Sequence, residues 1–123
     1  MKNTIIWFEI NVADLDKAKK FYDHVLQTNI RKEDVEGYPP MGIIPDEGVN
    51  GALVEDEEYE APEHSGIMLY FDGSSGINSY LERVEEAGGE VLVPRSFVNE
   101  SVGHWAAFSD LDGNLLALYE PPQ

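Results

Sequence analysis

The sequence carries one hydrophobic pattern twice, once in each half of the chain. Residues 5–25 and 64–84 align without a gap, and each begins with a strand-like apolar run and continues into a charged helix. In both helices the apolar residues have the i, i+3, i+4, i+7 spacing of one buried face. These residues are Ala18, Phe21, Tyr22 and Val25 in the first helix and Ile77, Tyr80, Leu81 and Val84 in the second. Such a chain is expected to fold as two copies of one unit.

Short strand patterns fill the remainder of each half, separated by turn residues. They cover residues 31–36, 41–45 and 51–55 in the first half and 90–97, 104–109 and 115–119 in the second. Each half therefore has the order β-α-β-β-β, and the predicted fold class is α+β. The acidic segment 55–63 has no apolar period and is the expected connection between the halves.

Three turn signals have simple structural explanations. Gly88-Gly89 is expected to end the second helix, and Ser74 or Ser75 is expected to cap its beginning. The segment "DLDGN" suggests a calcium loop, but an EF-hand needs Gly at its sixth position and Glu at its twelfth. Since Gly113 is the fourth residue of this segment, we expect a hairpin turn there.

Charge and composition exclude several classes of function. The chain has 24 acidic and 8 basic residues, a net charge of -16 and no cysteine. Nucleic-acid and membrane partners are therefore not expected, because phosphate backbones and anionic bilayers would be repelled. Thiol chemistry and Cys-ligated zinc are excluded. No apolar run approaches the ~20 residues of a membrane span, and no signal peptide is evident, so we expect a soluble, cytoplasmic protein.

Three segments together resemble the vicinal oxygen chelate superfamily: "FEINVADLDKAKKFYDHVL", "RVEEAGGEVLVPR" and "WAAFSDLDGNLLALYEPP". This superfamily includes glyoxalase I, bleomycin-resistance proteins and extradiol dioxygenases, and the chain looks closest to its uncharacterised glyoxalase-like proteins. The resemblance implies one domain over residues 1–123, with βαβββ modules at 1–57 and 64–123 that form paired half-barrels around a cleft. It also implies a homodimer, which a sedimentation experiment finding only monomer at micromolar concentration would exclude.

Enzymes of this superfamily hold a divalent metal with one ligand from the first and last strand of each module. The resemblance places these four positions at Trp7, Ala52, Gly66 and Ala117. None of these side chains offers the O or N donors that a divalent metal needs. We therefore expect neither a metal nor another cofactor. His64, two residues before Gly66, is the one candidate for a displaced ligand.

Strand alternation predicts which side chains face the cleft. Trp7, Glu9 and Asn11 share one face of the first strand, and the opposite face matches the buried helix stripe. By the same parity the cleft also receives Met68, Tyr70, Ala52, Val54, Ala117 and Tyr119. His24 is expected to be exposed, whereas His104 and Trp105 begin a strand at the expected rim of the cleft. The predicted ligand-binding residues are Trp7, Glu9, Asn11, Met68, Tyr70, His104, Trp105 and Tyr119.

Two functions of different classes follow. The first is a metal-free module that binds a small organic molecule, with aromatic side chains stacking on the ligand and Glu9 and Asn11 orienting it. The alternative is a glyoxalase-like lyase or isomerase with Glu9 as catalytic base, using an atypical metal site or none. A structural interpretation, in which the aromatic residues only fill the core, also remains open.

Overall fold

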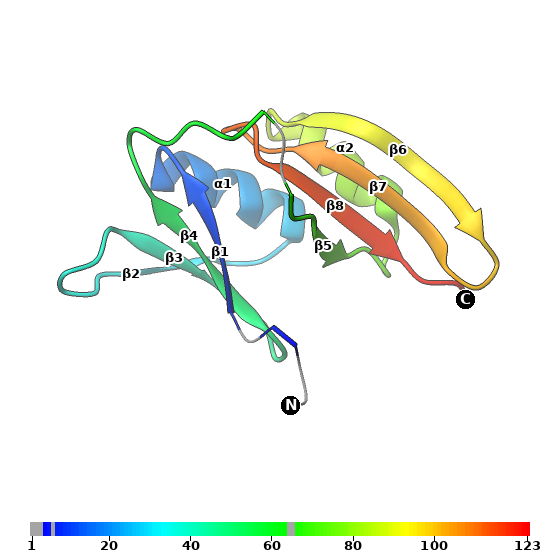
Figure 1. Ribbon diagram of the computed structural model, residues 1–123, viewed down its shortest axis with the longest axis horizontal. Coiled ribbons are helices and arrows are strands. Elements are labelled where there is room, and N and C mark those ends of the chain that lie inside the picture. Colours follow the sequence, from blue (N-terminus) through cyan, green and yellow to red (C-terminus); the bar gives the residue numbers. More distant parts are fainter. Residues whose placement is uncertain (1–3, 6, 64–65) are drawn as a thin grey trace. The chain divides into compact units, whose positions relative to one another are not determined.

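The computed structural model describes residues 4–5, 7–63 and 66–123. The chain divides into two compact units, Met1–Glu60 and Ala61–Gln123. Each unit contains one helix and one four-stranded sheet (Figure 1). The predicted α+β class and the tandem βαβββ arrangement are confirmed.

The two units have the same topology. The first contains β1 (Trp7–Val12), α1 (Leu15–Leu26), β2 (Arg31–Glu33), β3 (Met41–Ile44) and β4 (Asn50–Glu55). The second contains β5 (Leu69–Asp72), α2 (Ile77–Glu86), β6 (Glu90–Asn99), β7 (Gly103–Ser109) and β8 (Leu115–Glu120). Their sheet orders are β1-β4-β3-β2 and β5-β8-β7-β6. In each unit the first strand pairs in parallel with the last, and the other pairs are antiparallel.

The predicted helix stripes form the core of each unit. All four stripe residues of α1 are buried, and the rings of Phe21 and Tyr22 meet edge to face at 5.0 Å between centroids. In α2 three stripe residues are buried, while Tyr80 is half-buried beneath the guanidinium of Arg83. Alternate residues of the strands complete the two cores. They include Ile10, Val12 and Leu53 in the first unit and Phe108, Leu116 and Leu118 in the second.

The beginning of each helix is held by the last residue of the last strand. Glu55 accepts a hydrogen bond from the N–H of Leu15 at 2.9 Å, and Glu120 accepts one from the N–H of Ile77 at 3.0 Å. The predicted serine cap of α2 is wrong, because its N-cap residue is Gly76 and Ser74 instead bonds to Asp72. The backbone N–H of Ile77 thus bonds to a carboxylate distant in sequence rather than to the side chain of a neighbouring cap residue.

The structure corrects the alignment of the two repeats. The helix residues bonded to the strand carboxylates show that Leu15 is equivalent to Ile77, whereas the sequence pattern aligned Leu15 with Ser74. In the sheets Glu9 pairs with Ala52 and Tyr70 with Ala117, so Glu9 is equivalent to Tyr70 rather than to Met68. A shift of about one helical turn moves a buried stripe nearly onto itself, and a shift of two positions preserves strand alternation. The pattern therefore could not distinguish the two alignments.

The remaining turn predictions are confirmed. Gly88 follows the end of α2 with a φ of 95°, and Gly113 turns the β7–β8 connection with a φ of 85°. The carboxylate of Asp110 accepts hydrogen bonds from the backbone N–H groups of Asp112 and Asn114, each at 2.9 Å. The carboxylate of Asp110 is therefore used in hydrogen bonds within its own turn, as expected for a hairpin turn. Neither helix in the described residues has the length and apolar character needed to cross a membrane.

Candidate functional site: an aromatic pocket in the second unit

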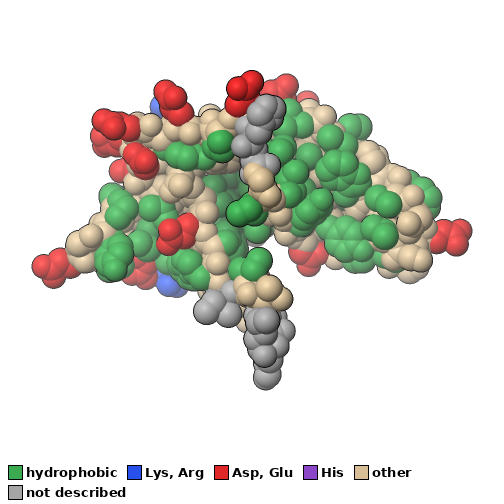
Figure 2. All heavy atoms as spheres, in the orientation of Figure 1, with side chains coloured by type: hydrophobic (Ala, Val, Ile, Leu, Met, Phe, Trp, Pro, Cys, Tyr) green, Lys and Arg blue, Asp and Glu red, His purple; other side chains and the backbone are tan. Residues whose placement is uncertain are grey.

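Aromatic side chains from three strands gather on one face of the second sheet. Successive residues of a strand point to opposite faces, and the pairing places Tyr70 beside Ala117 and Trp105 beside Tyr119. Helix α2 contacts the other face, where Leu116 and Leu118 are buried. We call the face that carries Trp105 and Tyr119 the open face; Figure 2 shows hydrophobic side chains spread over it.

A pocket of about 460 Å³ lies on the open face. Its lining residues are Tyr70, Val98, Val102, Trp105 and Tyr119. The volume falls within the range of small-molecule sites, and the lining has the aromatic and aliphatic character typical of them. The hydroxyl of Tyr119 donates a hydrogen bond to the carbonyl of Val102, which holds the ring against the β6–β7 turn. The pocket therefore presents flat surfaces for stacking, and that of Tyr119 is held in place.

Small residues form the sheet surface between these rings. Ala117 lies beside Tyr70 on one side and Ala107 on the other, and both alanines are buried. Because alanine projects only a methyl group, the larger side chains of Tyr70 and Trp105 rise above this part of the sheet. The sequence prediction that Ala117 shares a face with Tyr119 agrees with this pairing.

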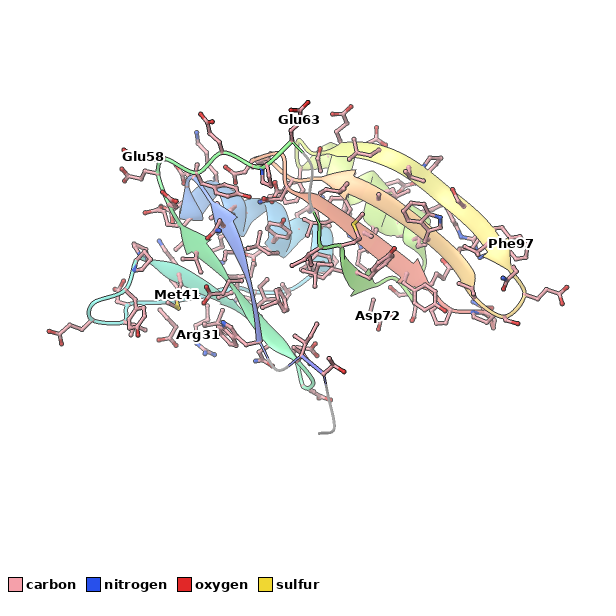
Figure 3. All side chains as sticks on the ribbon, viewed as in Figure 1. Arg31, Met41, Glu58, Glu63, Asp72 and Phe97 are labelled. Atoms are coloured by element: carbon pink, nitrogen blue, oxygen red, sulfur yellow. The ribbon has the colours of Figure 1, made fainter. Side chains whose placement is uncertain are left out.

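Asp72 supplies a carboxylate on the open face. It pairs in register with Tyr119, and it accepts a hydrogen bond from the backbone N–H of Ser74 at 2.9 Å. Hydrogen bonds from the hydroxyl and the backbone of Ser74 lower the pKa of Asp72 below its ordinary value. Asp72 is labelled at the end of β5 in Figure 3. The aromatic surface is therefore accompanied by a charge that remains negative near neutral pH.

Sequence reasoning identified three of the five pocket residues and missed Val98, Val102 and the neighbouring Asp72. The three identified are Tyr70, Trp105 and Tyr119. Strand alternation could have identified Val98. Phe97 pairs with His104, so the next residue, Val98, points to the opposite face, which also carries Trp105. However, β-bulges elsewhere in β6 interrupt the alternation, so the sequence alone did not define which β6 residues face the pocket.

His104 does not join the aromatic pocket. It pairs with Glu120 and Phe97, on the face opposite to Trp105. Its ring lies 5.2 Å from that of Phe97, and its Nδ1 lies 3.4 Å from Nη2 of Arg95. The prediction that grouped His104 with Trp105 is corrected by strand alternation, which sends neighbouring side chains to opposite faces.

In the first unit, Trp7, Glu9 and Asn11 share a face of β1, as alternation predicts, and all three are exposed. The indole N–H of Trp7 donates to the carboxylate of Glu9 at 3.1 Å. In β2 of the same sheet, Arg31 pairs with Glu33 at 2.8 Å, and Figure 3 labels Arg31 beside Met41. Glu9 is thus oriented by Trp7 on an exposed edge strand, without the apolar burial that would favour a general base.

The residues at the family's metal positions do not fit a divalent ion. The corrected repeat makes Met68, rather than Gly66, the equivalent of Trp7, and its thioether is a poor ligand for a hard divalent cation. Ala52 and Ala117 lie in β4 and β8 and offer only methyl groups. His64 lies outside the described residues. Among those described, no group of three or more His, Asp or Glu side chains is placed to hold a metal ion.

We expect the purified protein to contain no stoichiometric zinc, nickel, iron or manganese. Adding these ions should not raise its melting temperature, because none of the four positions supplies a donor suited to them, and binding could not then stabilise the folded state. Elemental analysis and thermal unfolding test this expectation. One equivalent of tightly held metal, lost in a Glu9→Ala or His64→Ala variant, would contradict it.

Two βαβββ units in tandem, each with its last strand pairing in parallel with its first, define the class of glyoxalase-like proteins. Residues 4–118 match the family model of the Glyoxalase/Bleomycin resistance protein/Dioxygenase superfamily. The chain belongs to this family.

Solved structures with a similar fold include a hypothetical protein, an antibiotic-binding protein and a fosfomycin resistance protein. A hypothetical protein, SA1046 from S. aureus, has 25% identity and a TM-score of 0.71, with coverage of 95% of this chain and 96% of that one. The antibiotic-binding protein TnmS3 from Streptomyces sp. CB03234 has 22% identity and a TM-score of 0.67, with coverage of 97% and 96%.

A mutant of the genomically encoded fosfomycin resistance protein FosX from Listeria monocytogenes, complexed with Mn(II) and 1S,2S-dihydroxypropylphosphonic acid, has 17% identity. Its TM-score is 0.70, with coverage of 98% of this chain and 94% of that one. No curated protein sequence matches the chain significantly. At identities of 25% or less these likenesses show a common fold, so the residues must carry any argument about function.

Proposed function

We propose that the protein binds a small organic molecule with a flat aromatic part, without a metal, in the pocket of Tyr70, Trp105 and Tyr119. The observation that carries this proposal is the aromatic lining of that pocket, with one ring fixed by the bond from Tyr119 to Val102. Family membership and the antibiotic-binding relative add support for this class of function. Trp7, Glu9, Asn11 and Met68 remain candidate ligand contacts, and a homodimer remains part of the proposal.

The charges favour a cationic ligand over an anionic one. The carboxylate of Asp72 lies on the same face as the pocket, and none of the pocket's lining residues is basic. The net charge of -16 also raises the local concentration of cations near the surface. A planar ring bearing a positive charge could therefore stack on the aromatic side chains and interact favourably with their π faces.

The test compares two probes with the same ring system and opposite charges, 9-aminoacridine and acridine-9-carboxylate. Fluorescence titration should show saturable binding of the cationic probe and at least about tenfold weaker binding of the anionic one. Trp105→Leu should weaken binding of 9-aminoacridine by about tenfold or more, because it removes the stacking surface. Tyr38→Leu is the control, since Tyr38 is 68% exposed and lies outside the pocket.

Equal affinity of the Trp105→Leu variant and the unmodified protein for both probes would contradict the proposed site. A preference for the anionic probe would contradict the cationic class while leaving the aromatic pocket in place. Circular dichroism of each variant separates loss of binding from loss of folding.

The enzyme alternative has weaker support in the geometry. Glu9 is exposed, its carboxylate already accepts the bond from Trp7, and the family's metal positions lack donors. Turnover of the hemithioacetal of methylglyoxal and glutathione, lost in a Glu9→Gln variant that still folds, would favour the lyase over the binding module.

A further inference from the structure

A second pocket lies on the opposite face of the same sheet, where β6 and β7 meet the end of the chain. It measures about 560 Å³, and its lining includes Arg95, Phe97, Asn99, Glu100, His104 and Pro121. Neighbouring residues contribute to the two pockets in turn: Val98, Trp105 and Tyr119 line the aromatic pocket, and Phe97, His104 and Glu120 line this one. We call it the helix-side pocket, because Glu120 also bonds to the first turn of α2.

Arg95 is held in place but keeps donors for a ligand. Its Nε and Nη2 donate to the two oxygens of Glu120 at 3.3 and 2.6 Å, and one of those oxygens also accepts from the N–H of Ile77. Both oxygens of Glu120 therefore accept hydrogen bonds within the protein. Among the described residues no partner takes the two hydrogens on Nη1 of Arg95, whose side chain is 37% exposed.

His104 provides a second donor. Nη2 of Arg95 lies 3.4 Å from its Nδ1, and a guanidinium can only donate hydrogen bonds. This contact is a hydrogen bond in the tautomer whose Nδ1 accepts, and that tautomer carries its ring hydrogen on Nε2. The side chain is 23% exposed, so the ring is not sealed from solvent.

Phe97 forms an apolar wall of the pocket. Its side chain is 62% exposed, and its ring lies 5.2 Å from the imidazole of His104 at an angle of 56°. Figure 3 shows Phe97 near the end of β6, where the strand approaches its turn into β7. An exposed ring beside two fixed donors is suited to a ligand with an acidic group and an apolar body.

We propose that the helix-side pocket binds a small organic acid. Its carboxylate lies between Nη1 of Arg95 and Nε2 of His104, and its apolar part packs on Phe97 and Pro121. Charge-assisted bonds from the guanidinium supply the specificity for an anion. Two carboxylates also line the pocket: the charge of Glu120 is balanced by its pair with Arg95, whereas Glu100 opposes binding. The repulsion by more distant carboxylates is screened over ~8 Å at physiological ionic strength.

The probes are benzoate and benzamidine, which share a ring and carry opposite charges. Titration followed by backbone amide signals in NMR should show benzoate shifting Phe97, Asn99 and His104 in a saturable manner, while benzamidine leaves these signals in place. His104→Leu should weaken benzoate binding by about tenfold through loss of one donor and the altered setting of Arg95. Phe97→Ala should weaken it by about three- to tenfold through loss of apolar contact.

Glu100→Gln should tighten benzoate binding by about twofold, because it removes an exposed negative charge near the bound carboxylate. A variant that only disturbed the fold would weaken binding instead. Trp105→Leu, on the open face, should leave benzoate affinity unchanged, which separates this site from the proposed aromatic site. Arg95 is not substituted, since it also holds Glu120.

Three results would overturn the proposal. They are equal shifts of the same signals by benzamidine, benzoate affinity unaltered by both His104→Leu and Phe97→Ala, and benzoate shifts confined to the surroundings of Trp105. Melting temperatures of all variants verify that each one folds.

Discussion

Replacing Phe21 by alanine is expected to lower the free energy of unfolding by about 3–5 kcal/mol. Phe21 is 1% exposed, and its ring meets that of Tyr22 edge to face in the stripe that α1 buries. Truncation loses the transfer free energy of the ring and leaves a cavity that the surrounding strands fill only in part.

Urea unfolding followed by circular dichroism measures this effect. Phe97→Ala is the matched control, because it removes the same side chain at a position that is 62% exposed, and it should change the free energy of unfolding by at most about 0.5 kcal/mol. If the two variants are equally stable, the assignment of the buried face of α1 is wrong.

Replacing Glu120 is expected to give the second largest loss, and the loss should depend on pH. Glu120 is 7% exposed, and its carboxylate bonds to Arg95 and to the N–H of Ile77. These two hydrogen bonds, that of Arg95 first, lower the pKa of Glu120 from 4.5 to about 2. Glu120→Ala leaves both donors without their acceptor, at a cost of about 2–3 kcal/mol at neutral pH.

The direction of the pH dependence follows from the lowered pKa. A carboxylate whose pKa is lower in the folded protein stabilises it fully above the ordinary value of 4.5, and this contribution disappears as the pH falls toward 2. The stability difference between the unmodified protein and Glu120→Gln should therefore be largest near neutral pH and should shrink through this window. The glutamine keeps an acceptor for Ile77 but loses the charge.

Glu33→Gln is the control for this experiment, since Glu33 pairs with Arg31 in the open, with side chains that are 40% and 65% exposed. Surface pairs of this kind contribute little, so its effect should stay within about 1 kcal/mol. A Glu120→Gln difference that is constant between neutral and acid pH would show that the charge of Glu120 does not stabilise the fold.

Local hydrophobic patterns were sufficient to predict the elements and their faces. Burial at every third or fourth residue located the stripe of Phe21, Tyr22 and Val25, and alternation placed Trp7 opposite Ile10. These patterns are reliable because a helix face and a strand face each bury side chains at a fixed period, whatever lies across from them. The family resemblance rests on the same elements in the same order.

The relation between the two halves needed the tertiary structure. The bonds from Glu55 to Leu15 and from Glu120 to Ile77 define equivalent positions in the helices, and the strand pairing moves the counterpart of Trp7 from Gly66 to Met68. The two residues joined by each of these hydrogen bonds are far apart in sequence, so no local sequence pattern predicts the bond. For the same reason the serine cap expected for α2 was wrong.

The sequence by itself determined the α+β class, the two βαβββ units and the buried helix stripes. Only the tertiary structure decided which side chains meet: Tyr70, Trp105 and Tyr119 around one pocket, and His104 with Arg95 and Glu120 on the other face. Periodicity is a property of one segment and can be read along the chain. A site depends on the register between strands, which is set by hydrogen bonds and packing among distant residues.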